Sequence, residues 1–161
     1  MFKLPNIIKK ALIFVLVLLA IIYSCLYINT HKFDRHNETQ LAKLKTINPN
    51  AYLIFSRFIN DIHTHTPYIV YIQSTLRSYK EQEKLHNDDP FNAKPGTSKH
   101  NKGLAIDFNV KYKYCLNGGW LKKADYLQWK QSGIITIAQK YGLFWGGNFK
   151  TKKDCVHFEI R

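Results

Sequence analysis

The sequence predicts an α+β domain with a small antiparallel sheet flanked by helices, placed after one N-terminal apolar helix. Three observations support this class. An uncharged apolar run lies near the N-terminus, apolar residues at helical spacing follow it, and short β-branched or aromatic runs then alternate with helical segments. With 161 residues, of which 45% are hydrophobic, the chain can build one packed domain plus an appendage.

The apolar run from Ala11 to Ile28 predicts a membrane-spanning segment. As a helix rising about 1.5 Å per residue, it nearly crosses a hydrocarbon core of about 30 Å. We favour a retained anchor over residues 1–30, because the run is long and lacks an A-x-A-like cleavage site. A cleaved signal and a lipoprotein signal ending at Cys25 are the alternatives, and a buried core helix is the weakest one. The first three place the C-terminal part outside the cytoplasm, and a retained anchor makes it a single-pass protein of the cell membrane.

Residues 31–50 are polar and charged, and predict a tether or short helix before a domain over 51–161. The domain opens with apolar residues at the spacing of an amphipathic helix: Leu53, Ile54, Phe58, Ile59 and Ile62. Pro67 marks the end of this helix.

The next segments predict strands and helices in alternation. A buried strand is expected over 68–75, and a short helix over 78–86 with Ser78 and Glu81 in a capping box. The remaining predicted elements are a long loop over 87–102, a strand over 103–112, a turn at 117–119, a helix over 126–141 that continues through Gly133 to a cap at Gly142, a turn at 145–149 and a strand over 155–160.

The formal net charge of +13 fits an anionic partner, such as a polymer or lipid of a bacterial envelope or a nucleic acid, and fits a merely soluble basic surface at least as well. The basic residues are scattered, with no clustered patch or base-stacking motif, so nucleic acid is not predicted. Cys115 and Cys155 could form a disulfide outside the cytoplasm, and the sequence leaves this open. The sequence contains no CxxC pair, so a cysteine zinc site is not predicted. The sequence predicts no oligomeric state.

Two separated clusters carry the residue types of a hydrolytic zinc site, SKHNKGLAID and DCVHFE. Such a site needs about three nitrogen or oxygen ligands and one open position. His100 follows the long loop, and Asp107 lies on the next strand. Gly103 and Ala105 share the Asp107 face, where their small size is expected to leave room for an ion. Spacing alone does not separate this site from an ordinary His–Asp hydrogen bond.

Family motifs separate them. SKHNKGLAID resembles the SxHxxGxAxD signature of the M15 zinc peptidases, the group of D-alanyl-D-alanine carboxypeptidases and phage endolysins. WGGNF followed by DCVHFE resembles the L-alanyl-D-glutamate endopeptidase branch, and LRSYKEQEKL is similar to an Arg-Ser…Gln segment of the family. The likeness runs from about Ile69 to the C-terminus, in the family's order. It implies the M15 or hedgehog-like peptidase fold.

The resemblance implies a role for each matching residue. Three residues match the zinc ligands: His100, Asp107 and His157. Asp154 matches the acidic general base, and Arg77 matches an arginine that holds substrate or stabilises developing charge. The residues expected on the substrate side are Arg77, Gln82 and Ser98. Asn148 and Phe149 depart from the family pattern, which leaves substrate detail open.

The implied function is a zinc-dependent peptidoglycan peptidase that hydrolyses a stem-peptide bond, with the L-alanyl-D-glutamate bond preferred. A D-alanyl-D-alanine carboxypeptidase is the alternative within the enzymes. A non-catalytic cell-wall-binding module on the same fold is the alternative outside them.

Other residues have competing interpretations. His63 and His65 form an HxH pair, for which a solvated helix end is preferred to a metal site. Glu159 shares a strand face with His157, and a structural ion pair is preferred to a supporting role at the metal. The tryptophans could stack on sugars, but core packing is preferred for the first two and Trp145 is left open: Trp120, Trp129 and Trp145.

Overall fold

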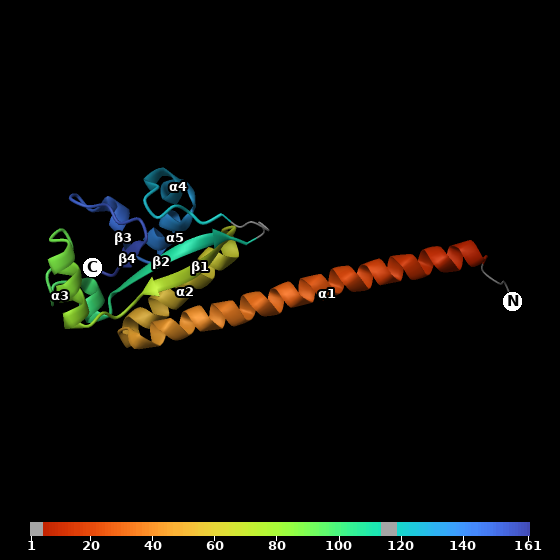
Figure 1. The fold of residues 1–161 in the computed structure, drawn as a ribbon, viewed down its shortest axis with the longest axis horizontal. Helices are drawn as coiled ribbons and strands as arrows, with labels where there is room; N and C mark the ends of the chain where they lie inside the picture. Colours follow the sequence, from red (N-terminus) through yellow and green to blue (C-terminus); the bar gives the residue numbers. More distant parts are fainter. Residues whose placement is uncertain (1–4, 114–118) are drawn as a thin grey trace. The chain divides into compact units, whose positions relative to one another are not determined.

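The computed structural model describes residues 5–113 and 119–161. It divides into two compact units, Met1–Thr39 and Gln40–Arg161. The elements are α1 (Asn6–Lys43), η1 (Leu44–Thr46), α2 (Pro49–His65), β1 (Tyr68–Ser74), α3 (Tyr79–Asp88), η2 (Lys99–Lys102), β2 (Ala105–Tyr112), α4 (Tyr126–Gln131), α5 (Ile134–Lys140), β3 (Phe144–Trp145), η3 (Gly146–Asn148) and β4 (His157–Glu159), where η denotes a 3₁₀ helix (Figure 1). The predicted α+β class with an antiparallel sheet is confirmed.

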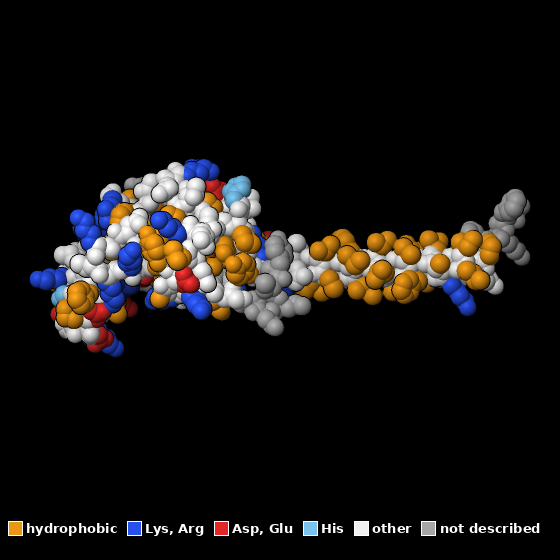
Figure 2. Space-filling model, turned by 90° about the horizontal axis from the view of Figure 1, so that it is seen from above, with side chains coloured by type: hydrophobic (Ala, Val, Ile, Leu, Met, Phe, Trp, Pro, Cys, Tyr) orange, Lys and Arg blue, Asp and Glu red, His pale blue; other side chains and the backbone are white. Residues whose placement is uncertain are grey.

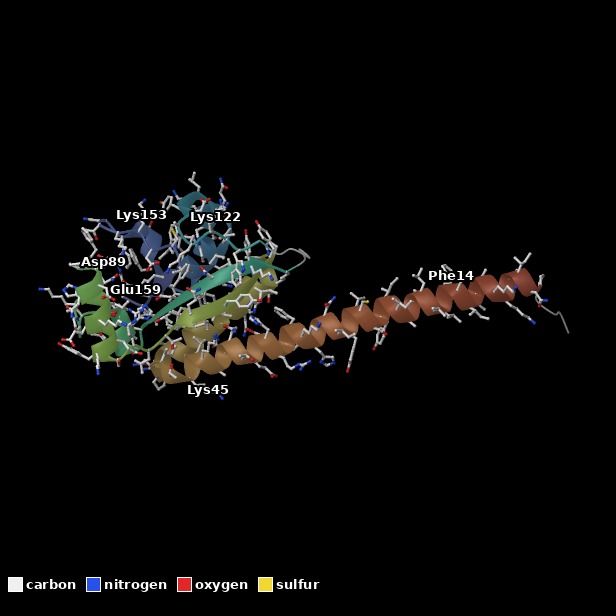
Figure 3. The ribbon with its side chains drawn as sticks, viewed as in Figure 1. Phe14, Lys45, Asp89, Lys122, Lys153 and Glu159 are labelled. Atoms are coloured by element: carbon white, nitrogen blue, oxygen red, sulfur yellow. The ribbon has the colours of Figure 1, made fainter. Side chains whose placement is uncertain are left out.

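α1 contains the apolar run of the first unit. Its large apolar side chains are exposed and line the helix in Figure 2, and Phe14 points away from the helix axis in Figure 3. Ser24 and Thr30 donate their hydroxyls to backbone carbonyls one turn earlier, which satisfies them without water. Within the described residues, this is the one helix long and apolar enough to cross a membrane. Residues 31–43, expected as a tether or short helix, continue α1.

The second unit begins at the end of α1, where two side chains bond to the outer strand of the sheet. Gln40 accepts a hydrogen bond from the Ile72 backbone N–H through Oε1, at 2.7 Å, and Lys43 Nζ donates to the Ile72 carbonyl at 2.9 Å. Leu44 and Ile47 follow and are buried in the core. Because an open strand edge can pair with other chains, these bonds also protect β1.

The sheet has the strand order β1-β2-β4-β3, and every neighbouring pair is antiparallel. Its buried face packs against α2, as the rings of Phe58 and Phe108 show with centroids 5.9 Å apart. Side chains alternate along a strand, so Asp107, next to Phe108, projects from the opposite face. Asp107 is paired in register with His157 on β4.

Two predictions about α2 and α3 are confirmed. α2 ends at His65, before Pro67, and Pro49 occupies its first turn. α3 carries the predicted capping box between Ser78 and Glu81. The prediction of a solvated His63 is wrong: its ring is buried, and Nε2 accepts a hydrogen bond from the Val70 N–H at 3.0 Å.

The predicted continuous helix over 126–141 is also wrong. Gly133 has φ +80° and separates α4 from α5, a conformation that side chains disfavour. The Ser132 hydroxyl accepts from the Ile134 N–H and satisfies a donor at the start of α5. Trp129 is fully buried, as expected, whereas Trp120 is half exposed, contrary to its predicted place in the core. Gly142 ends the second helix with φ +67°.

Candidate metal centre

Three side chains from separate elements converge on the open face of the sheet. His100 comes from η2, Asp107 from β2 and His157 from β4. His100 Nε2 lies 3.1 Å from Asp107 Oδ1 and 3.2 Å from His157 Nδ1, and the third side of the triangle measures 2.9 Å. One candidate ligand atom from each lies within 4.8 Å of the others. The three residues predicted as ligands therefore meet at one point.

The triangle has the dimensions of a zinc site. Zinc binds imidazole nitrogen and carboxylate oxygen at about 2.0–2.2 Å in a tetrahedron, which makes each ligand–ligand edge about 3.3 Å. The three edges of 2.9–3.2 Å are slightly shorter, so a small outward movement would admit the ion. The donor set of two imidazoles and a carboxylate also matches a hydrolytic site with one open position.

The 3₁₀ turn η2 presents His100 to this point. Ser98 caps η2 by accepting a hydrogen bond from the His100 N–H, and the ring Nδ1 lies 2.6 Å from the Thr75 carbonyl. Gly103, with φ +65°, ends the turn. A Cβ at Gly103 would lie 2.6 Å from the Asn48 backbone nitrogen, so this glycine allows close backbone packing. The expectation that Gly103 leaves room for the ion is wrong.

The two oxygens of Asp107 have different partners. Oδ1 faces both histidines, whereas Oδ2 accepts a hydrogen bond from Arg77 Nη2 at 3.3 Å. Burial by itself raises the pKa of Asp107, but the hydrogen bonds with His100 and His157 outweigh it and hold the pKa far below its usual range. Asp107 is therefore a carboxylate near neutral pH, as a metal ligand must be.

Hydrogen bonds hold the Arg77 guanidinium in place. Its Nη1 donates to Gln82 Oε1 at 2.8 Å, and its Nη2 also donates to Ser74 Oγ at 3.1 Å. The Gln82 amide nitrogen donates to the Ala93 carbonyl at 2.7 Å, and the side chain is only 1% exposed. Gln82 is therefore a buried partner of Arg77 and does not lie on an open surface. Ser98 is likewise buried, beside His100.

The WGG segment shapes the approach to His157. Trp145 is 3% exposed and donates its indole N–H to the Cys155 carbonyl at 2.8 Å, so it anchors the returning chain and is not an open sugar platform. A Cβ on Gly147 would lie 2.3 Å from the Trp145 ring, and one on Gly146 would lie 2.5 Å from the Asp154 carbonyl oxygen. Both glycines are therefore needed for this packing.

Asp154 precedes His157 in a tight turn. The Asp154 N–H donates to the Gly146 carbonyl, and the His157 N–H donates back to the Asp154 carbonyl at 3.3 Å. This turn is the bend that the sequence required between the two residues. Asp154 is partly exposed and is not one of the three converging ligands. Its role as a base stays a prediction.

Glu159, for which a structural ion pair was the preferred interpretation, is a direct partner of the His157 ring. His157 Nε2 lies 3.0 Å from Glu159 Oε2, and Glu159 is 7% exposed. Burial by itself lowers the pKa of His157, but the hydrogen bonds with Asp107 and Glu159 outweigh it and raise the pKa to about 9. The spacing of two residues on one strand was the signal for this contact.

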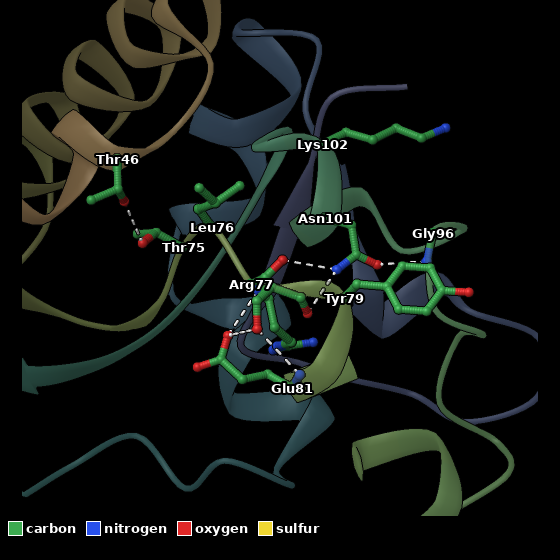
Figure 4. Close-up of a pocket in the computed structure, with 10 residues that line it drawn as sticks. Thr46, Thr75, Leu76, Arg77, Tyr79, Glu81, Gly96, Asn101 and Lys102 are labelled. Atoms are coloured by element: carbon green, nitrogen blue, oxygen red, sulfur yellow. Dashed lines mark hydrogen bonds between the residues drawn. The ribbon is translucent and has the colours of Figure 1, made fainter. Parts of the chain in front are cut away.

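Two grooves border the segment that carries Arg77. One, of about 550 Å³, lies between the end of β1 and α3, and its lining includes Gln73, Ser74 and Lys84. The other, of about 710 Å³, is shown in Figure 4, where Asn101 donates to the backbone carbonyls of Arg77 and Ser78.

The disulfide considered between Cys115 and Cys155 involves Cys115, which lies outside the described ranges.

Comparison with known sequences agrees with this geometry. Residues 92–160 match the M15 peptidase family model described as D-alanyl-D-alanine carboxypeptidase. The chain is 33% identical over 105 residues to the peptidoglycan L-alanyl-D-glutamate endopeptidase CwlK of Bacillus subtilis (strain 168). That match covers 56% of this chain and 60% of the relative, so the chain spans less than two thirds of the relative's length.

Solved structures show a similar fold. The Serratia marcescens L-Ala D-Glu endopeptidase ChiX superposes with a TM-score of 0.56 at 20% identity, covering 76% of this chain and 86% of ChiX. A mutant of the vancomycin-resistance D,D-pentapeptidase VanY, in complex with Zn(II), gives a TM-score of 0.51 at 14% identity, covering 71% and 72%. At these identities the likeness concerns the fold alone.

Proposed function

We propose, on the premise that residues 92–160 of this chain belong to the M15 family of peptidases, that the protein is a zinc-dependent peptidase acting on the stem peptides of bacterial peptidoglycan. The observation that carries the proposal is the convergence of His100, Asp107 and His157 within 4.8 Å. Motif order, the match to the family model and the identity with the Bacillus endopeptidase support it.

His100, Asp107 and His157 are proposed to hold the zinc ion. Zinc bound there would lower the pKa of a coordinated water from about 15.7 to about 7. Asp154 accepts the proton of the attacking water and returns it to the leaving amine. Arg77, fixed by Gln82 and Asp107, offers its guanidinium to the negative charge that develops on the peptide carbonyl.

Gln82 and Ser98 serve this chemistry through their neighbours. Gln82 fixes Arg77, and Ser98 fixes the backbone of His100. Arg77 also lines the groove between the end of β1 and α3, so a substrate held against the guanidinium would lie along this groove.

The preferred bond is L-alanyl-D-glutamate, because the WGG and DCVHFE segments and the Bacillus relative point to that branch. The second candidate is a D-alanyl-D-alanine carboxypeptidase, favoured by the description of the matching family model. Digestion of purified peptidoglycan separates them by mass analysis. A new amino terminus on D-glutamate supports the first, and release of terminal D-alanine supports the second.

The apolar part of α1 is proposed to anchor the protein in the cell membrane, with Gln40–Arg161 outside the cytoplasm. Membrane fractionation and protease protection of intact cells test this location. A domain cleaved only after the cells are lysed would contradict it.

The proposed base has a direct test. Asp154→Ala is expected to lower kcat by about 10²- to 10⁴-fold, the range for general acid–base catalysis, while zinc content measured by elemental analysis stays at one ion per chain. His100→Ala is the contrasting variant, since it should lose both zinc and activity. Full activity in Asp154→Ala would remove Asp154 from the mechanism. A zinc-loaded wild type that releases nothing from peptidoglycan would instead favour a wall-binding module.

A further inference from the structure

We infer that Glu159 is a positioning residue for the metal centre: its carboxylate orients the His157 ring so that Nδ1, and not Nε2, faces the ion. This inference rests on the proposed function for the identity of the metal. Glu159 contacts the nitrogen of His157 that does not face Asp107.

The rings of His100 and His157 are oriented in opposite senses. His100 turns Nε2 toward Asp107, and its Nδ1 lies 2.6 Å from the Thr75 carbonyl oxygen. His157 turns Nδ1 toward Asp107, and its Nε2 lies 3.0 Å from Glu159 Oε2. In each ring, one nitrogen faces the centre and the other faces an oxygen that accepts an N–H.

In the metal-bound protein, this arrangement favours one tautomer for each ring. A neutral imidazole carries one N–H, and a metal binds the nitrogen that lacks it. When a metal occupies the inner nitrogen, the oxygen beside the outer nitrogen accepts the one remaining N–H. A backbone carbonyl does this for His100, and a carboxylate does it for His157, which also makes the bound nitrogen more basic.

The backbone of β4 holds Glu159 firmly in this position. β4 is an inner strand, and Glu159 is in register with Ala105 on β2 and Phe144 on β3. His157 and Glu159 are two residues apart, so they share a face of the strand. A strand paired on both edges positions a side chain more precisely than a loop does.

The carboxylate is nearly buried and has a second partner. Glu159 is 7% exposed, and Arg161 Nε donates to its Oε1 at 3.1 Å, with the guanidinium over the Phe144 ring. A buried carboxylate costs free energy unless its oxygens are hydrogen-bonded. The Arg161 bond occupies Oε1 and leaves Oε2 for His157.

The test measures zinc affinity and tautomer, not only activity. The full-length chain is purified in detergent micelles and stripped of zinc, and its Kd for zinc is measured by competition with a chromogenic chelator. Glu159→Ala is expected to raise the Kd by about 10- to 100-fold, and Glu159→Gln, which keeps an acceptor without the charge, by less. Long-range ¹H–¹⁵N spectra of the zinc-bound wild type should show His157 protonated at Nε2.

The matched control is Asp61→Asn. Asp61 lies on α2 and forms an ion pair with Lys140 on α5, so this variant also removes one negative charge but should leave the Kd unchanged. If Glu159→Ala fails to fold by circular dichroism, Glu159→Gln decides. An unchanged Kd in a folded Glu159 variant, or a wild type that binds no zinc, overturns the inference. A wild type whose zinc affinity depends on Glu159 but which cuts no peptidoglycan overturns the proposed function and leaves the positioning role standing.

Discussion

Asp107 connects the parts of the candidate site at the scale of single residues. One oxygen faces the two histidines, and the other receives the Arg77 guanidinium. Loss of Asp107 would therefore remove one of the three proposed metal ligands. In the described part of the chain, it would also leave the partly buried Arg77 side chain with Ser74 and Gln82 as its hydrogen-bond partners. The hydrogen bonds with His100 and His157 hold the pKa of Asp107 far below its usual range, so the carboxylate stays ionised although it is buried.

The protonation of His157 leads to a prediction about metal binding. Burial lowers the pKa of His157, but Asp107 and Glu159 outweigh it and raise the pKa to about 9. The ring is therefore a positively charged imidazolium, with both nitrogens protonated, in the metal-free protein at pH 7. Zinc binds only the deprotonated ring, and its binding should release about one proton from His157. Calorimetric heats measured at pH 7 in buffers of different ionisation enthalpy should show this release.

The sign of the pH dependence follows from the raised pKa. Below pH 9, zinc must displace a proton from the His157 ring. As the pH rises through 9, the ring becomes neutral before zinc binds, so the number of protons released on binding should fall. Heats that do not depend on the buffer at pH 7 would show that His157 is already neutral in the metal-free protein.

Among the elements, α3 determines how firmly Arg77 is held, because Arg77 precedes its cap and Gln82 lies in its first turns. Ser78→Ala removes the acceptor for the Glu81 N–H and should lower the free energy of unfolding by about 1 kcal/mol. Denaturant unfolding measures this change. Ser78→Gly is the internal comparison, since glycine at this position costs only a few tenths of a kcal/mol. Equal losses in the two variants would exclude a capping effect.

The turn from η3 to β4 depends on close packing around Gly146. A Cβ there would lie 2.5 Å from the Asp154 carbonyl oxygen and 2.9 Å from His157 Cβ. Gly146→Ala should therefore destabilise the fold by about 1–3 kcal/mol and weaken zinc binding, because both neighbours must move. Gly119→Ala is the matched control, with nothing within 4 Å of the added Cβ. Unchanged unfolding and zinc affinity in Gly146→Ala would contradict this packing.

The sequence predicted elements best where a local pattern determined them. Ser78 and Glu81 predicted a capping box three residues apart, and Pro67 predicted the end of α2. The break at Gly133 was missed because apolar residues lie on both sides of it, with Leu127 before it and Ile134 and Ile137 after it. The left-handed turn at Gly133 accompanies the packing of α5 against α2 and β3, which is a tertiary contact that the local pattern does not show.

The three candidate ligands were predicted from motif resemblance and not from spacing, because no local rule brings residues 100, 107 and 157 together. The support under the ligands was harder to predict. Gln82 and Glu159 act through tertiary contacts with Arg77 and His157, and a sequence gives no distance for such contacts. The fold class, by contrast, follows from alternation of apolar patterns along the chain.

The second unit, Gln40–Arg161, begins before residue 51, and we expect its first residues to contribute to its stability. A chain starting at residue 51, the expected start of the domain, lacks buried Leu44 and Ile47 and the Gln40 bond to the edge of β1. Removing large buried apolar side chains costs about 2–5 kcal/mol each, and two are lost, so a 51–161 fragment should be at least about 4 kcal/mol less stable than a 40–161 fragment. Thermal and denaturant unfolding of the two fragments, compared in one buffer, measure the difference. Equal stability would mean that residues 40–50 contribute no net packing free energy, and that the domain begins at residue 51 as the sequence predicts.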